Sequence, residues 1–329
     1  MSDALPRITI IVPTKPGQEN IPAVEAARRF DYPKDKLEIL VARGRQPAVQ
    51  RNTALRAATG ELIYFLDDDA VAPPDNLRLA LVHFKDSRVQ MVGGPNLCPS
   101  DAPCIEQVFA VVLASWLAFG PSRARYDSVG AARPSGEKEL ILCNMMARRD
   151  ALLELGGFDE ALYPNEENAL MDDLQARGAT LLYDPAFIVN RRPRPTLKAF
   201  CKMLFTYGRG RAEQFRLHPT PGSALNFVPP LFVAYLAAFL VALGIPFAGP
   251  AAVLARWSGL PLCLYLVTVV GQTVASIPGK GFFHSMLAMP LLIASHVFYG
   301  LGFWRGLTTK LKTPGDKPAT EVKLDWMPA

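Results

Sequence analysis

The distribution of hydrophobic residues divides the chain into two regions. From residue 7 to about residue 190, short β-branched runs alternate with helix-like segments, a pattern typical of a mostly parallel sheet with crossover helices. From Ala224 to Trp304, the only formally charged residues are Arg256 and Lys280. An apolar stretch of this length indicates a membrane region rather than the core of a soluble domain.

The first region is predicted to fold as an α/β domain. The pattern predicts strands at residues 7–12, 37–42, 62–66, 89–93, 140–147 and 180–183. It predicts helices at residues 21–30, 47–58, 76–84, 150–155 and 167–177. Ligands of open sheets bind beyond the carboxyl ends of the strands, so we expect the chemistry directly after each strand.

The second region contains three apolar blocks, at residues 224–255, 257–279 and 281–304. Each exceeds the roughly 20 residues that a helix needs to cross about 30 Å of hydrocarbon. Lysines and arginines cluster on both sides of the region, so the positive-inside rule predicts a multi-pass inner-membrane protein with both flanks in the cytoplasm. Three full crossings would put the flanks on opposite sides. The proline-rich first block is therefore either a span with a re-entrant piece or a tight hairpin.

A shorter apolar segment, residues 104–120, is compatible with a helix on the membrane surface or with a buried core helix. The net charge of +5 over 329 residues lies largely beside the apolar blocks, where it favours anionic lipid head groups over nucleic acid. The five cysteines include no CxxC pair, which suits a reducing compartment.

The strongest chemical signal is the run of Asp67, Asp68 and Asp69 after the apolar strand 62–66. Three adjacent carboxylates repel one another unless a cation neutralises them. Mg²⁺ or Mn²⁺ takes oxygen ligands and commonly combines one or two carboxylates with substrate phosphates. The run therefore predicts a metal site that holds a nucleotide diphosphate, although a solvated turn before Pro73 and Pro74 is the simpler explanation.

Two further segments carry candidate chemistry. Glu166 and Glu167 stand at the start of the helix predicted at 167–177. Either the helix dipole simply stabilises these carboxylates, or one of them is a general base for an acceptor hydroxyl. Residues 200–216 form an amphipathic stretch of aromatic and basic residues ahead of the membrane blocks. In that stretch Arg209 and Arg211 either snorkel to the interface or clamp phosphates of the donor or of a lipid.

Together these motifs resemble the family 2 glycosyltransferases of the GT-A fold, and most of all the branch of succinoglycan-type enzymes that build exopolysaccharides. The resemblance covers residues 7–216 closely and the membrane region more loosely. It implies a GT-A catalytic domain over 1–195, an amphipathic interface helix over 196–222, three or possibly four transmembrane helices over 223–305, and a cytoplasmic tail over 306–329.

The resemblance also implies roles for individual residues. Asp69 and Asp67 would bind the metal, and the donor nucleotide would contact the residues Pro13, Thr14, Arg51, Asp67 and Asp68. Glu166 and Glu167 would be catalytic, with Glu167 at the position of the base. Phosphate or acceptor binding would fall to Asn144, Arg209 and Arg211.

Two features of the family have no counterpart here. The acid that contacts the nucleobase after the second strand is absent, because Arg43 and Gly44 stand there. No histidine follows the last strand, where the sequence reads Asn190, Arg191 and Arg192. The resemblance implies a UDP-sugar donor, and this chain lacks the family's acid that contacts the nucleobase.

The leading hypothesis is an inverting, Mg²⁺- or Mn²⁺-dependent transferase that moves a hexose from a nucleotide-diphospho-sugar to a membrane-bound, polyprenyl-linked acceptor. One alternative is transfer directly onto polyprenyl phosphate. A second, non-enzymatic alternative is a nucleotide-sensing membrane scaffold, which the retained carboxylates disfavour.

Overall fold

The computed structural model describes residues 5–160, 162, 165–217, 219, 221–245, 257–311 and 321–329. Its contacts divide the chain into two compact units. The first, called the sheet unit, contains the described residues of Met1–Ser100, Pro121–Arg192 and Lys312–Ala329. The helical unit contains those of Asp101–Gly120 and Pro193–Leu311.

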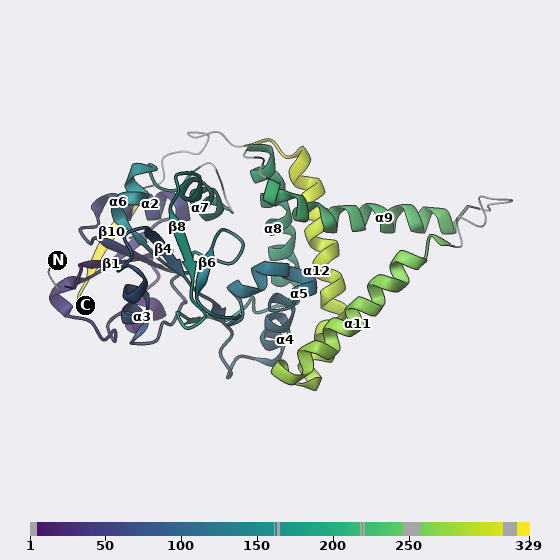
Figure 1. Ribbon diagram of the computed structural model, residues 1–329, viewed down its shortest axis with the longest axis horizontal. Helices are drawn as coiled ribbons and strands as arrows, with labels where there is room; N and C mark the ends of the chain where they lie inside the picture. The colour runs from purple at the N-terminus through teal and green to yellow at the C-terminus, as the bar shows by residue number, and fades with distance from the viewer. Residues whose placement is uncertain are drawn as a thin grey trace. The chain divides into compact units, whose positions relative to one another are not determined.

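The sheet unit is built on one mixed eight-stranded sheet of order β10-β2-β1-β3-β7-β4-β8-β6 (Figure 1). Its strands are β1 (Ile8–Thr14), β2 (Leu37–Arg43), β3 (Leu62–Leu66), β4 (Val89–Gly93), β6 (Arg133–Ser135), β7 (Asn144–Arg148), β8 (Thr180–Tyr183) and β10 (Lys323–Met327). A two-stranded sheet joins β5 (Asn96–Leu97) to β9 (Val189–Asn190).

The sheet departs from the mostly parallel arrangement that the alternation predicts. Strand β1 pairs in parallel with β2 and β3, and β4 pairs in parallel with β8. Strand β7 runs antiparallel between β3 and β4. Strand β6 pairs antiparallel with β8, and β10 pairs antiparallel with β2. Strand direction follows from tertiary connections, and the hydrophobic pattern of a short buried strand is the same in both directions.

Helices cover both faces of this sheet. They are α1 (Pro22–Ala27), α2 (Pro47–Ala57), α3 (Asn76–His83), α6 (Arg149–Glu154) and α7 (Glu166–Ala176), with a short 3₁₀ helix at Lys34–Lys36. One core cluster packs residues of α1 and α3 against the sheet, and a second packs residues of α2, α6 and α7 against it. Prolines occupy the first turns of α1 and α2, where the missing amide proton costs nothing.

The last strand of the chain completes one edge of the sheet. Residues 323–327 pair antiparallel with β2, with Lys323 opposite Arg43 and Met327 opposite Ile39. In Figure 1 the yellow C-terminal strand accordingly lies beside the purple segments from the start of the chain. The region expected as a cytoplasmic tail, 306–329, therefore ends inside the sheet unit.

The helical unit has helices of two kinds. Short or amphipathic helices are α4 (Cys104–Leu113), α5 (Trp116–Phe119) and α8 (Leu197–Leu217), and long apolar helices are α9 (Val228–Leu243), α11 (Leu260–Lys280) and α12 (Phe282–Thr308). A 3₁₀ segment at Pro221–Phe227 precedes α9, and another at Gly120–Arg125 begins at the last residue of segment 101–120 and continues into the sheet unit. The part of the first apolar block from residue 246 to 256 lies outside the described residues.

Glycines bring α8 and α12 into close contact. A Cβ atom at Gly208 would lie 2.0 Å from the carbonyl oxygen of Tyr299, and one at Gly302 would lie 2.0 Å from that of Phe205. A Cβ atom at Gly306 would lie 2.3 Å from the carbonyl oxygen of Arg209. Small residues at such positions let two helix backbones approach, as in membrane helix pairs.

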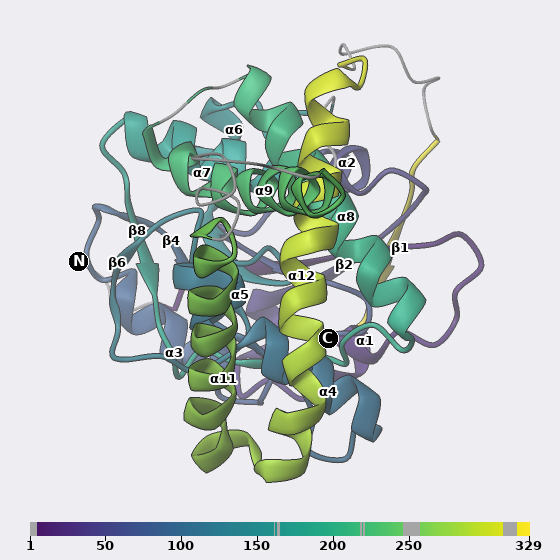
Figure 2. The same cartoon turned by 90° about the vertical axis from the view of Figure 1, so that its right-hand side faces the viewer.

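Three helices of this unit are long and apolar enough to cross a membrane: Ser223–Leu243, Leu260–Lys280 and Phe282–Thr308. The bent pair Cys104–Leu113 and Trp116–Arg125 would make a fourth if it formed one span. Figure 2 shows α9 end-on while α11 and α12 run vertically across the picture, so α9 projects away from α12. The most apolar stretch of α12 is 39 % buried, against 6 % and 11 % for the other two.

Candidate active site

Carboxylates and guanidinium groups meet at the ends of the central strands of the sheet unit. Asp67 follows β3 and lies between two arginines: its Oδ1 is 3.0 Å from Nη2 of Arg51, and its Oδ2 is 3.1 Å from Nη1 of Arg191. Asp69 accepts a 2.5 Å hydrogen bond from Nε of Arg191. The run of acids that the sequence singled out is therefore neutralised in part by side chains from two distant segments.

Arg51 connects these acids to the second acidic segment. It lies in α2 with a side chain only 7 % exposed, and its Nη1 is 3.2 Å from Oε1 of Glu166 at the start of α7. One guanidinium thus contacts both Asp67 and Glu166, from segments about 100 positions apart in sequence. The structure thus brings together, through Arg51, the two sets of carboxylates that the sequence analysis singled out.

Arg191 is the residue of this cluster that the sequence reasoning missed. It follows β9, at the place where the family histidine was found to be lacking. Although its burial lowers the pKa, Asp67 and Asp69 raise the pKa of Arg191 well above its ordinary value. The signal that could have identified it was its position directly after a strand, which was the rule used for the acids.

Asp68 lies in a different environment from its neighbours. Its Oδ2 accepts a 3.4 Å hydrogen bond from Oγ1 of Thr14, at the end of β1. Burial raises the pKa of Asp68, and the nearby charge of Asp69 raises it further, while a hydrogen bond from the Gln18 side chain opposes the rise. The carboxylate of Asp68 therefore contacts the end of β1, whereas the carboxylate of Asp67 contacts the two arginines.

Glu166 and Glu167 differ in exposure although they are adjacent. Asn165, in the left-handed conformation with φ 101°, precedes them and begins α7. The side chain of Glu166 is 4 % exposed, and burial followed by the charge of Glu167 raises its pKa to about 7. Glu167 is only half-buried. The pair thus combines one carboxylate that holds Arg51 with one that solvent or a ligand can reach.

The end of β1 carries the residues expected to line a nucleotide pocket. Pro13 pairs with Ala42 and Thr14 with Arg43 in the parallel register with β2. The buried amide of Gln50 donates to the carbonyl oxygens of Thr14 and Ala42, at 2.9 and 2.6 Å. These bonds fix the ends of both strands side by side, so that Thr14 is presented at the carboxyl edge of the sheet.

The donor set for a divalent cation consists of carboxylates at this edge. Asp69 is half exposed and Asp67 is 24 % exposed, and both present oxygen atoms, the ligands that Mg²⁺ and Mn²⁺ prefer. Within the described residues no three His, Cys, Asp or Glu side chains are grouped to coordinate a metal ion. Two carboxylates fit the usual Mg²⁺ site, in which substrate phosphates and water complete the shell.

Asn144, expected to bind phosphate or acceptor, lies in the core with hydrogen-bond partners there, and a binding role for it stays a prediction. It is fully buried; its Oδ1 accepts from Tyr64 Oη at 2.8 Å, and its Nδ2 donates to the carbonyl oxygen of Phe187 at 2.5 Å. Buried amides need such partners, and here the core supplies them.

Arg209 and Arg211 lie in α8 of the helical unit. Nε of Arg209 is 3.4 Å from Glu213, and Nη1 of Arg211 is 3.2 Å from Oε1 of Gln214. Gly208 and Gly210, which flank Arg209, are both buried, and the contact of Gly208 with Tyr299 gives it a role in helix packing. A phosphate-binding role for the two arginines stays a prediction.

The mixed sheet with acids at the end of β3, followed by helices apolar enough to cross a membrane, defines the class: a GT-A domain with a C-terminal region of long apolar helices. The chain belongs to glycosyl transferase family group 2, whose sequence profile matches residues 62–297. A solved structure with the same fold is the mannosyltransferase PcManGT from Pyrobaculum calidifontis in complex with GDP-Man and Mn²⁺. It superposes with a TM-score of 0.55 at 20 % identity, over 90 % of this chain and 87 % of that one.

Two curated relatives match part of the chain. Pre-mycofactocin glycosyltransferase of Mycobacterium tuberculosis is 27 % identical over 184 residues, which are 53 % of this chain and 36 % of that protein. Succinoglycan biosynthesis protein ExoA of Rhizobium meliloti is 28 % identical over 194 residues, 59 % of this chain and 54 % of that protein. The chain therefore spans about a third to about half the length of these relatives.

Proposed function

We propose that this protein is an inverting hexosyltransferase that uses a nucleotide-diphospho-sugar and a membrane-bound acceptor to build an envelope or extracellular polysaccharide. The observation that carries the proposal is the contact of Arg51 with both Asp67 and Glu166. This contact supports a single site, in which one arginine side chain links the acids proposed to bind the donor to the acids proposed to act on the acceptor. The similarity to ExoA supports the polysaccharide product.

The donor is proposed to bind at the ends of β1 and β3. Pro13 and Thr14 would line the nucleotide pocket, and Asp67, Asp68 and Arg51 would surround the ribose and diphosphate. Asp67 and Asp69 would hold Mg²⁺ or Mn²⁺, which would stabilise the negative charge left on the diphosphate when the sugar departs. Arg191, already paired with both carboxylates, adds positive charge at the same place.

Glu167 is proposed as the general base. It is the more accessible acid of the pair, and a base must reach the hydroxyl proton that it removes. Glu166 would accept a hydrogen bond from Arg51 and keep the guanidinium oriented between the two acidic segments. A single base on the acceptor side corresponds to a single displacement with inversion at the anomeric carbon.

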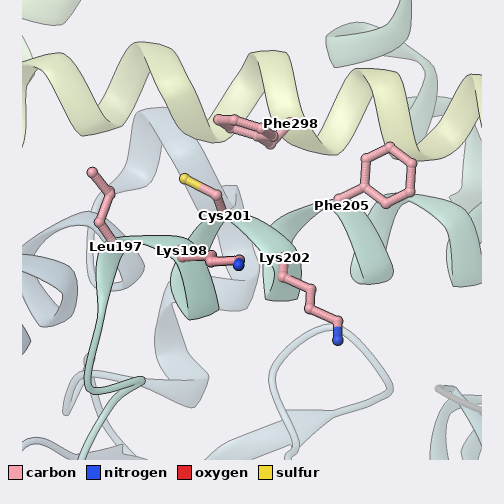
Figure 3. Close-up of a pocket in the computed structure, with 6 residues that line it drawn as sticks. All are labelled: Leu197, Lys198, Cys201, Lys202, Phe205 and Phe298. Atoms are coloured by element: carbon pink, nitrogen blue, oxygen red, sulfur yellow. The ribbon is translucent and has the colours of Figure 1, made fainter.

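The acceptor is proposed to be a lipid-linked phosphate or pyrophosphate. The helical unit contains a groove of about 660 Å³ lined by Leu197, Lys198, Cys201, Lys202, Phe205 and Phe298. Figure 3 shows Phe298 of α12 facing α8, from which Lys198 and Lys202 project. Apolar walls beside two ammonium groups match an isoprenoid chain with an anionic head.

We further propose that the chain crosses the membrane an even number of times, with the sheet unit in the cytoplasm. Residues up to Arg192 and the strand Lys323–Met327 belong to one sheet, so they lie on one side of any bilayer. The residues before and after segment 101–120 belong to the sheet unit, so on this proposal the bent helix pair of that segment would be re-entrant.

Of the three apolar helices, α12 is the one assigned to the interface. It packs along α8, whose five basic residues cannot lie at membrane depth, and it is the most buried of the three. Helices α9 and α11 then form the spanning hairpin.

Single cysteines at Ser258 and Gly281, placed in a cysteine-free background, test this assignment with a membrane-impermeant maleimide added from outside. Labelling at Ser258 but not at Gly281 is expected, and the reverse result would contradict the hairpin.

The function is tested by a donor screen on the detergent-solubilised full chain, which includes UDP- and GDP-hexoses because GDP-Man is the ligand in the Pyrobaculum structure. Release of nucleoside diphosphate that depends on Mn²⁺ and on a lipid-linked acceptor is expected. Glu167→Gln should lower turnover by about 100-fold while nucleotide binding persists, since it removes only the base. Equal loss of binding in the Glu167→Gln and Asp69→Ala variants would contradict the assigned roles.

Product analysis separates the alternatives. If sugar is transferred to polyprenyl phosphate without an oligosaccharide primer, the protein makes a lipid-phosphate sugar. If the Asp69→Ala and Glu167→Gln variants both complement a deletion strain fully, the protein acts as a scaffold rather than as an enzyme.

A further inference from the structure

The C-terminal strand makes side-chain contacts that reach toward the proposed nucleotide pocket. Asp325 lies on β10, and its Oδ2 accepts a 2.5 Å hydrogen bond from Nε of Arg43, the last residue of β2. Both side chains are mostly buried, with 24 % and 19 % exposed. The hydrogen bond with Arg43 lowers the pKa of Asp325, so the carboxylate is ionised at neutral pH and the pair is a true ion pair.

Arg43 carries this contact to the loop after β1, residues 15–20. Its Nη1 donates to the carbonyl oxygen of Gln18 at 2.7 Å. The loop is exposed apart from Gln18, and Gly17 within it has a φ of 76°. The Arg43 guanidinium therefore ties an otherwise exposed turn to the edge of the sheet, and Asp325 fixes the direction in which that guanidinium points.

The end of β1 links this contact to the acidic run. Thr14, which pairs with Arg43 in the register of β1 and β2, donates a hydrogen bond from its hydroxyl to Oδ2 of Asp68 at 3.4 Å. The contacts of Asp325 with Arg43 and of Arg43 with Gln18 therefore lie beside the strand end that reaches Asp68. These contacts begin in the last strand of the chain and end at the edge where the donor is proposed to bind.

We propose that Asp325 is a positioning residue for the nucleotide site: it orients Arg43, which holds the 15–20 loop over the end of β1 beside Asp68. The inference rests on the proposed function, because it takes the ends of β1 and β3 as the donor site. Asp325 itself does not touch the donor. Its effect is on donor affinity, because the loop must be in place before the nucleotide binds, and the transfer step uses other residues.

The test compares variants of the full chain in detergent. Asp325→Asn keeps the size of the side chain and removes its charge, and it should raise the donor KM and the nucleoside diphosphate Kd about tenfold with little change in kcat, as for loss of one charge-assisted hydrogen bond. Asp325→Glu should restore part of the affinity. Arg43→Met should match Asp325→Asn, and the double variant should be no worse than either single variant, because both act through one contact.

Two controls separate positioning from a general loss of structure. Glu321→Gln removes an exposed carboxylate just before β10 and should leave the KM unchanged. Amide hydrogen exchange should quicken in residues 15–20 of Asp325→Asn and remain unchanged in α2. If exchange quickens throughout the sheet, or if the KM stays at the wild-type value, Asp325 has no positioning role.

The proposed function and this inference fail in different ways. A wild-type protein that neither binds nucleoside diphosphate nor transfers sugar overturns both. A wild-type protein that binds the nucleotide with the same affinity as Asp325→Asn overturns only the role of the C-terminal strand.

Discussion

Replacing Glu166 by glutamine should stabilise the protein at pH 8 and leave its stability at pH 5 nearly unchanged. Glutamine resembles the protonated glutamic acid in shape and charge. Since Glu166 is buried, with a pKa raised to about 7, the surroundings favour the neutral form despite the nearby Arg51. The variant therefore holds permanently the form that the folded protein prefers.

The sign follows from proton binding. Between pH 4.5 and 7 the unfolded chain releases the Glu166 proton while the folded protein still keeps it, so the stability of the wild type falls as the pH rises through this window. Moving the pKa from 4.5 to about 7 corresponds to about 3 kcal/mol between the two limits. The glutamine variant has no proton to lose at this position, so its stability should not fall with rising pH for this reason.

Thermal unfolding followed by tryptophan fluorescence, at a single scan rate from pH 5 to pH 8.5, measures the effect. For a unit of roughly 200 residues, a gain of about 3 kcal/mol corresponds to a Tm rise on the order of 5–10 °C at pH 8. Glu154→Gln, which neutralises an exposed carboxylate of α6, is the matched control and should follow the wild-type curve. A glutamine variant that is less stable than the wild type at pH 8 would refute the reasoning.

Three other outcomes are expected. Glu167→Gln should lower the pKa of Glu166, because the charge of Glu167 helps to raise it, and the same unfolding series should show the wild-type decline displaced to lower pH. Asp69→Ala should weaken Mn²⁺-dependent binding of nucleoside diphosphate by about tenfold or more in calorimetry, with metal-free binding little affected. Gly208→Ala should reduce the yield of folded protein in size-exclusion chromatography, because the added Cβ meets a carbonyl oxygen at 2.0 Å, whereas Gly271→Ala in α11, with nothing within 4 Å, should not.

The sequence predicted the elements whose patterns are local. The strands at 62–66, 89–93 and 180–183 have the predicted bounds, and the helices near them begin and end within a few residues of the expected positions. These segments combine a continuous apolar run or a helical period with clear turn residues at their ends, so neighbouring sequence decides their structure.

Features that depend on distant partners were missed. Strand β10 is five residues long and gains its stability from β2, which is about 280 positions away, so no local pattern marks it. Asn144 was expected to bind phosphate or acceptor, and its burial among core residues was not predicted, because the residues that surround it come from distant segments. The acids were found because adjacent carboxylates repel, whereas Arg191, the cation that partly relieves this repulsion, has no such signature of its own.

The position of β10 after the long apolar helices sets an order for biosynthesis. The ribosome makes the first seven strands of the sheet, then the long apolar helices, and only afterwards the segment that covers the open edge of β2. Until that moment β2 presents unpaired backbone groups, which can template association with other chains. If the apolar helices enter a membrane as they are made, as the proposed topology requires, the edge of the sheet beside the proposed donor site would be completed only on chains that are already inserted.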